Sequence, residues 1–184
     1  MARVPYIDSK DLPPGYEDVV PSSALNIRRA LANSPEGARR NGALAMFIRH
    51  KMKLDPRLRE LAILQVGYLT RCVYEYAHHI ELARQFGCSD DDIRAVAAET
   101  AGRPSKLEPL AKAVLRAARE MTDGLGVSDA TYAVLKESLD HERYVELVLA
   151  IAVYNATVRI LESLKVDLEP ECRRYLEEFP LPAG

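Results

Sequence analysis

From residue 22 to the end of the chain, apolar residues recur at intervals of three and four, the spacing that lines up one face of an α-helix. No segment shows the period-two alternation of a half-buried β-strand, and the valines and isoleucines fall inside the helical pattern. Residues that start and stop helices divide this pattern into about seven or eight segments. The sequence therefore predicts an all-α fold, a multi-helix bundle.

Capping residues, prolines and glycines mark the ends of these segments. Asp55 followed by Pro56 is a good start, and Ser89 precedes three aspartates that complement the helix dipole. Ser105 and Glu108 have the spacing of a capping box. We expect helices within residues 22–34, 35–51, 71–86, 110–121, 129–139 and 142–164. Two further helices are expected to begin at residues 56 and 90.

The first 21 residues differ from the rest, because they contain four prolines and Gly15. Such a segment does not hold a long helix. We expect an extended N-terminal arm over residues 1–21 and a single all-helical domain over 22–184, since 184 residues suit one domain and no flexible linker divides them.

Composition excludes several classes of protein. The net charge of −2 lacks the basic excess of a nucleic-acid binder. The longest apolar run, Leu147–Tyr154, is too short to cross a bilayer and predicts a central or subunit-contact helix. The N-terminus lacks the apolar region of a secretory signal, and three widely spaced cysteines do not suggest a disulfide framework. We therefore expect a cytoplasmic protein without membrane or nucleic-acid partners.

Chemistry-bearing residues gather between Leu58 and Gly87. On a helix, Cys72, Glu75, Tyr76 and His79 share one face, whereas His78 lies about 120° from Cys72. A glutamate and a histidine four residues apart can touch and transfer protons, while a phenol and a thiol can donate hydrogen bonds to developing negative charge. The alternative is that Glu75 and His79 form an ordinary surface pair.

This segment resembles the carboxymuconolactone decarboxylase family, which shares the fold of the alkyl hydroperoxidase D superfamily. In the peroxidase branch, a glutamate is followed after eleven intervening residues by a C-x-x-C pair, and a histidine follows after three more. In this chain eleven residues separate Glu60 from Cys72. Glu75 stands in the place of the second cysteine, and three residues separate it from His79. The decarboxylase branch has a Y-E-W-x-x-H-like core, similar to YEYAHH at 74–79. The flanking LDPRLRELAIL, ARQFGCSDDDI and YVELVLAIAVYNATVRILESLKV extend the resemblance over about 40–166.

The resemblance implies a cofactor-free lyase or isomerase acting on a small carboxylated or lactone-like metabolite. Because a carboxylate replaces the second thiol, we expect proton-transfer chemistry with His79 as the donor, Glu75 as its partner and Glu60 completing the relay from the preceding helix. Cys72 belongs to the same catalytic set. Tyr76, His78 and Arg71 are the candidates for binding substrate. The resemblance also implies a homo-oligomer, a trimer or hexamer.

Three alternatives remain open from the sequence. Cys72 could serve a thiol-dependent peroxidase, although it lacks the neighbouring resolving thiol. The chain could be a binding protein that retains the fold. The E-x-x-H element formed by Glu75 and His78 occurs in di-iron bundles, but no second such element is present, so we expect no metal. For the leading hypothesis we expect Glu60 or Glu75 to be buried with a raised pKa, as a coupled set with His79.

Overall fold

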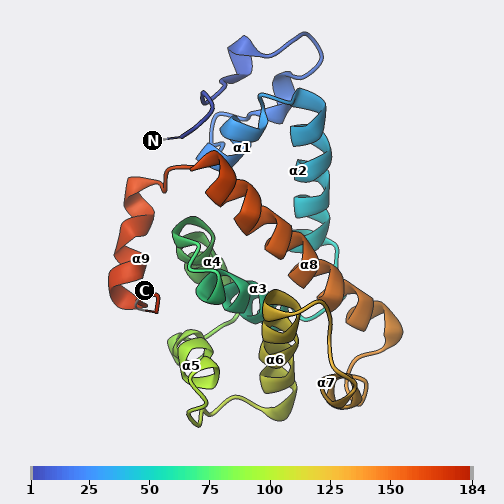
Figure 1. Cartoon of the computed structure of the whole chain (residues 1–184). Helices are drawn as coiled ribbons and strands as arrows, with labels where there is room; N and C mark the ends of the chain where they lie inside the picture. The colour runs from blue at the N-terminus through green and yellow to red at the C-terminus, as the bar shows by residue number, and fades with distance from the viewer. Residues whose placement is uncertain (1, 183–184) are drawn as a thin grey trace.

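The chain is all-helical, as predicted. The structure, a computed structural model, describes residues 2–182, and within this range it contains nine α-helices, three short 3₁₀ helices and no strand (Figure 1). The helices are α1 (Asn26–Leu31), α2 (Pro35–His50), α3 (Pro56–Leu69), α4 (Val73–Gln85), α5 (Asp90–Thr100), α6 (Pro109–Asp123), α7 (Asp129–Leu135), α8 (His141–Leu164) and α9 (Arg173–Glu178). The 3₁₀ helices are η1 (Ser9–Asp11), η2 (Glu17–Val19) and η3 (Pro170–Cys172).

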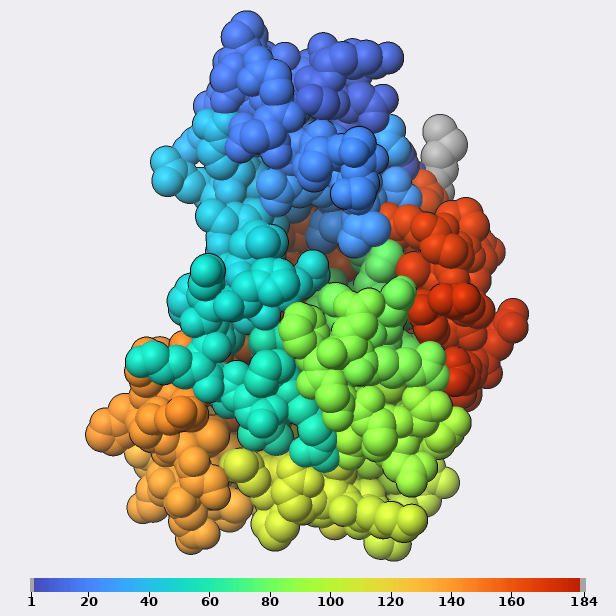
Figure 2. Space-filling view, turned by 180° about the vertical axis from the view of Figure 1, so that it is seen from behind, coloured from blue at the N-terminus to red at the C-terminus, as the bar shows by residue number. Residues whose placement is uncertain are grey.

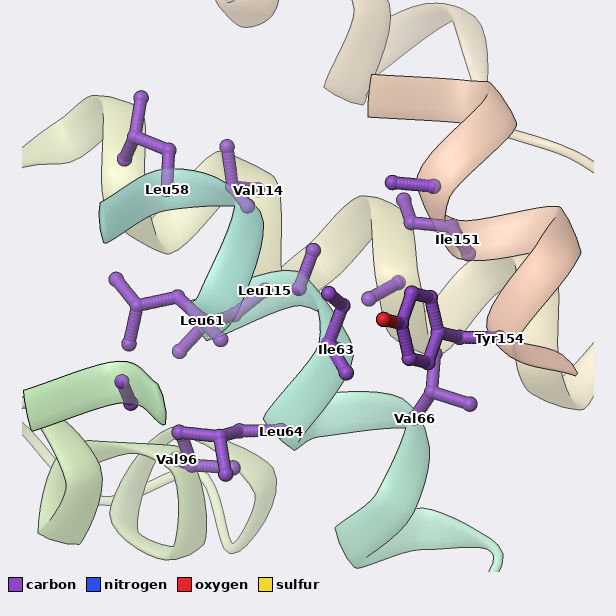
Figure 3. Packing of buried hydrophobic residues seen from close by; sticks show 14 of the residues in the cluster. Leu58, Leu61, Ile63, Leu64, Val66, Val96, Val114, Leu115, Ile151 and Tyr154 are labelled. Atoms are coloured by element: carbon purple, nitrogen blue, oxygen red, sulfur yellow. The ribbon is translucent and has the colours of Figure 1, made fainter. Parts of the chain in front are cut away.

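Helix α3 is the centre of the bundle. It packs against α4, α5, α6 and α8, and every residue from Leu58 to Gly67 is buried. Figure 3 shows its leucine, isoleucine and valine side chains meeting those of α5, α6 and α8. A helix enclosed on all sides exposes no polar face to water, so the polar residues on α3 must find partners inside the protein.

Helix α4 lies close against α3 because the contact includes a glycine. A Cβ atom at Gly67 would stand 3.2 Å from the backbone nitrogen of Tyr76, tighter than ordinary van der Waals contact. The absence of a side chain there lets the two backbones approach. This close packing brings the polar residues of α3 within reach of those on α4.

Helix α8 carries the apolar run predicted to be central. Leu147, Ile151 and Tyr154 are buried against the core, while Val145 is 62% exposed. By length and a mean hydropathy of 1.5, α8 is the one helix in residues 2–182 that could cross a membrane, and 39% of that window is buried inside the protein. Its packing along α3 and α6 accounts for the apolar side that faces inward.

Several predicted boundaries need correction. The capping box lies at Ser89 and Asp92. Ser105 instead donates a hydrogen bond to Glu99 and accepts one from the backbone nitrogen of Leu107, so it is not the N-cap of α6. Glu108 is instead the residue before Pro109, which starts α6. The first and seventh helices are shorter than predicted, over Asn26–Leu31 and Asp129–Leu135. Local spacing overestimated these two, because it does not show where tertiary packing ends.

The N-terminal segment contains no long helix, as predicted, but it is folded onto the domain. Val19 and Val20 are buried with Ala32 and Ala38 in a small second apolar cluster. The backbone nitrogen of Arg3 donates to the carbonyl of Leu164 at the end of α8. Figure 1 shows the segment, in dark blue, covering the end of the molecule beyond α1 and α2. The division into an arm and a domain stays a prediction.

Candidate active site

His79 lies between two carboxylates. Its Nδ1 is 2.7 Å from Oε2 of Glu60 on α3, and its Nε2 is 2.8 Å from Oε1 of Glu75, one turn earlier on α4. All three residues are at least 95% buried. The predicted Glu–His–Glu arrangement is therefore present, with both ring nitrogens engaged.

Glu60 is held from its other side by Arg59. The Nε and Nη2 atoms of Arg59 donate to Oε1 of Glu60 at 2.9 and 2.8 Å, which leaves Oε2 for His79. Arg59 is 2% exposed, and its guanidinium also lies 4.5 Å from the ring centroid of Phe86. Arg59 and Glu60 can both be buried on α3 because their opposite charges compensate each other.

The four charges of this cluster alternate in sign. Burial alone would lower the pKa of His79, but the charges and hydrogen bonds of Glu60 and Glu75 outweigh it and raise the pKa to about 9. Burial alone would raise the pKa of Glu60, but His79 and then Arg59 hold it below its ordinary value. The prediction of a raised carboxylate pKa is thus wrong for Glu60, because the charge and hydrogen bond of His79, together with those of Arg59, outweigh the effect of burial.

A cavity of about 400 Å³ opens beside the cluster. It is bounded by α1, α2, α4 and α8, and Figure 2 shows the hollow between the blue and cyan helices α1 and α2 and the green helix α4. Glu75 and His79 line it, whereas Glu60 does not. Apolar side chains make up much of the remaining wall: Leu25, Ile27, Leu31, Ala45, Met46, Ile48, Leu82 and Val153.

Besides Glu60, three of the predicted site residues do not line this cavity. Cys72 is fully buried as the residue before α4, and Tyr76 packs its ring 5.8 Å from that of Tyr68. Arg71 is exposed, with a left-handed φ of 52°. The helix starts at Val73 rather than at Arg71, so Cys72 lies outside it. Tyr76 is on the helix but packs against α3, so that only Glu75 and His79 of the predicted common face line the cavity.

Cys72 is also poorly suited to react as a thiolate. Burial, followed in effect by the charge of Glu75, raises the pKa of its thiol to about 12. Cys88 and Cys172 are buried free thiols as well. Thiol nucleophiles act as thiolates and need a lowered pKa, so the environment of Cys72 does not favour peroxidase chemistry.

His78, predicted to be the less central histidine, also lines the cavity. Its Nε2 is 2.6 Å from Oε2 of Glu169, which lies in the loop after α8. The other oxygen of Glu169 accepts hydrogen bonds from the backbone nitrogen of Asn26 and from the hydroxyl of Tyr74. Glu169 therefore ties the C-terminal segment, α1 and α4 together at the edge of the cavity.

Sequence reasoning missed the cavity residues that come from distant helices. Arg28 and Arg49 line the cavity, and neither makes an ion pair within residues 2–182. Tyr154 lines it from α8, with its ring centroid 4.9 Å from that of His79 and the rings at 85°. A local pattern could not single these out, because an arginine near a helix end and a tyrosine in an apolar run are ordinary. No group of three or more potential metal ligands occurs in the described part of the chain.

Solved structures share this fold over most of the chain or nearly all of it. A peroxidase-related protein from Ralstonia eutropha JMP134, with an alkylhydroperoxidase AhpD core, matches 98% of both chains with a TM-score of 0.80 and 17% identity. The debrominase Bmp8 covers 84% of this chain and 82% of its own, with a TM-score of 0.71 and 16% identity. A peroxidase-related protein from Silicibacter sp. TM1040 covers 79% and 76%, with a TM-score of 0.67 and 19% identity. At these identities the likeness shows the fold alone.

The fold is that of the alkylhydroperoxidase AhpD core. No curated protein sequence matches the chain significantly. Residues 35–120 match the profile of the carboxymuconolactone decarboxylase family. This match agrees with the family that the sequence motifs predicted.

Proposed function

We propose that this protein is a cofactor-free acid–base enzyme that moves a proton at a carbon atom of a small carboxylated or lactone-like metabolite. The observation that carries the proposal is the row Glu60–His79–Glu75, which begins in the protein core and ends at the cavity. Such a row can store a proton away from water and deliver it to one side of a bound molecule.

Glu75 is the group that touches the substrate. Both ring nitrogens of His79 are engaged by carboxylates, so His79 exchanges protons with substrate through Glu75 rather than directly. This differs from the sequence-based hypothesis, in which His79 was the donor. With a pKa of about 9, His79 carries a proton at neutral pH and can supply it to Glu75.

The chemistry balances without a redox partner. In an isomerisation, Glu75 takes a proton from a carbon next to a carbonyl, and the electron pair moves onto the carbonyl oxygen as an enolate. Return of the proton to the same or a neighbouring carbon completes the reaction. In a decarboxylation, the carbon–carboxylate bond breaks, carbon dioxide leaves, and the enolate takes its proton from Glu75, which His79 reprotonates.

The cavity supports a small anionic substrate with an apolar body. Arg28 and Arg49 present positive charge without an intramolecular carboxylate partner in the described range, which suits a carboxylate ligand. The apolar walls suit a compact carbon skeleton, and about 400 Å³ is at the small end of ligand pockets. The opening of Glu75 to this cavity also disfavours a scaffold role, for which a closed, dry face was expected.

The test is proton exchange in deuterated water. The purified protein is incubated with carboxymuconolactone, the compound in the family's name, and with simple β-keto carboxylates, and NMR follows deuterium incorporation and loss of carbon dioxide. Glu75→Gln should reduce turnover by about 10²-fold or more, the scale of general acid–base catalysis. Glu81→Gln is the control, because Glu81 lines the same cavity from α4 but lies outside the row.

Two outcomes would contradict the proposal. One is unchanged turnover by Glu75→Gln on a compound that the unmodified protein converts. The other is a complete lack of exchange and decarboxylation across the panel by folded, unmodified protein.

A further inference from the structure

Tyr154 faces the catalytic row from the opposite helix. Its ring stands edge-on to His79, with centroids 4.9 Å apart, and its side chain lines the cavity from α8. The residue is 7% exposed. Figure 3 shows its hydroxyl directed away from α8 toward α3, the helix that carries Glu60.

The hydroxyl of Tyr154 has no hydrogen-bond partner among residues 2–182. A buried tyrosine usually finds one; Tyr74, for example, bonds to Glu169 and to the backbone of Ile27. Within residues 2–182, two side-chain polar atoms are completely buried and lack a hydrogen-bond partner: Nε of Arg29 and Nε of Arg39. The Tyr154 hydroxyl is therefore not completely buried, and Tyr154 is one of the residues that line the cavity.

This hydroxyl stays a neutral donor. Burial, then the negative charges of Glu75 and Glu60, raise the pKa of Tyr154 well above its ordinary value. A phenol kept neutral beside a catalytic carboxylate can donate a hydrogen bond, and it does not compete with Glu75 for the substrate proton.

We propose that Tyr154 is a further catalytic residue, whose hydroxyl donates a hydrogen bond to the enolate oxygen of the reacting substrate. The inference rests on the proposed function. When Glu75 removes the proton from carbon, the electron pair of the broken C–H bond moves through the adjacent carbon onto the carbonyl oxygen. A donor placed where this charge develops stabilises the enolate more than the starting carbonyl. When the C–H bond reforms, the electron pair returns and the hydrogen bond weakens.

The probe is 4-nitrophenolate, a planar anion that resembles an enolate and absorbs light differently from its neutral acid. Its affinity for each protein variant is measured by absorbance titration at a pH where the free probe is ionised. Tyr154→Phe should bind it about tenfold more weakly, roughly the contribution of a hydrogen bond to a charged acceptor. The variant should fold normally, because the hydroxyl makes no hydrogen bond to the described protein. Tyr144→Phe, the same change on α8 at a tyrosine packed against Tyr132, is the matched control and should bind like the unmodified protein.

A second variant separates this inference from the proposed function. Glu75→Gln mimics the state in which Glu75 has accepted the substrate proton, so it removes a negative charge from the cavity and should tighten phenolate binding. Equal affinity of Tyr154→Phe and unmodified protein, with tighter binding by Glu75→Gln, would overturn only the role of Tyr154. No effect of Glu75→Gln would overturn the proposed function and, with it, the catalytic role of Tyr154. Failure of the unmodified protein to bind 4-nitrophenolate would overturn the inference as well.

Discussion

Nε2 of His78 lies 2.6 Å from Oε2 of Glu169, 91 residues later in the chain. The carboxylate of Glu169 also accepts hydrogen bonds from Asn26 and Tyr74, so one side chain joins α1, α4 and the loop after α8. Burial alone would raise the pKa of Glu169, but the hydrogen bonds from His78 and Asn26 hold it below its ordinary value. The wall of the cavity thus depends on a residue outside the family motif.

Removing this carboxylate should destabilise the protein. Glu169→Ala leaves three donors without their acceptor, and an unsatisfied buried group costs about 1–3 kcal/mol. We expect a loss of stability of that size in urea unfolding and a melting temperature lower by several degrees. Glu171→Ala, at an exposed neighbouring glutamate, is the control and should be close to neutral. Equal stability of the two variants would contradict the linking role of Glu169.

The protonation of His79 should make stability depend on pH. Its pKa is about 9 in the folded protein against an ordinary value of 6.5, so the folded state binds the proton more tightly. The resulting stabilisation, on the order of 3 kcal/mol, is fully present below pH 6.5 and is lost as the pH rises through about 9. NMR titration of the His79 ring should show the raised pKa directly, and Glu60→Gln should lower it, whereas Glu81→Gln should not. A His79 that titrates near 6.5 in the folded protein would refute the paired arrangement.

The cysteines should be inert in the native state. Burial raises the pKa of Cys72 and Cys88 to about 12 and that of Cys172 to about 11, and all three are buried. We expect thiol-modifying reagents to label the native protein far more slowly than the urea-unfolded protein, and Cys72→Ser to keep full proton-exchange activity. Rapid labelling of Cys72, or peroxide consumption that requires it, would favour the thiol peroxidase alternative.

Assembly is predicted to use the outer face of α8. Val145 is 62% exposed, and Ala152 and Ala156 are exposed on the same helix, so this apolar face lacks a cover in the single chain. We expect a trimer or hexamer by light scattering at micromolar concentration, and a shift toward monomer in Ala152→Glu. Lys106→Glu, an exposed site in the loop before α6, controls for the added negative charge. A monomeric mass for the unmodified protein would contradict the prediction.

The helical nature of the chain and the core of its site were determined by local sequence. Asp55 and Pro56 begin α3 where predicted, and Asp55 accepts hydrogen bonds from the backbone nitrogens of Arg57 and Leu58. The four-residue spacing of Glu75 and His79 produces their direct contact. These features depend on helix geometry, which acts over one turn and can be read from neighbouring residues.

Only the tertiary structure decided which distant residues complete the site. Glu169, Arg28, Arg49 and Tyr154 come from separate segments, and their positions depend on how the helices pack rather than on the turn in which each lies. The same packing turned Cys72 and Tyr76 away from the cavity. It also brought His79 on α4 against Glu60 on α3, and the charge and hydrogen bond of His79 lower the pKa of Glu60 instead of letting burial raise it. Charge coupling inside a protein depends on distance and burial, and a sequence pattern specifies neither of these for residues on different helices.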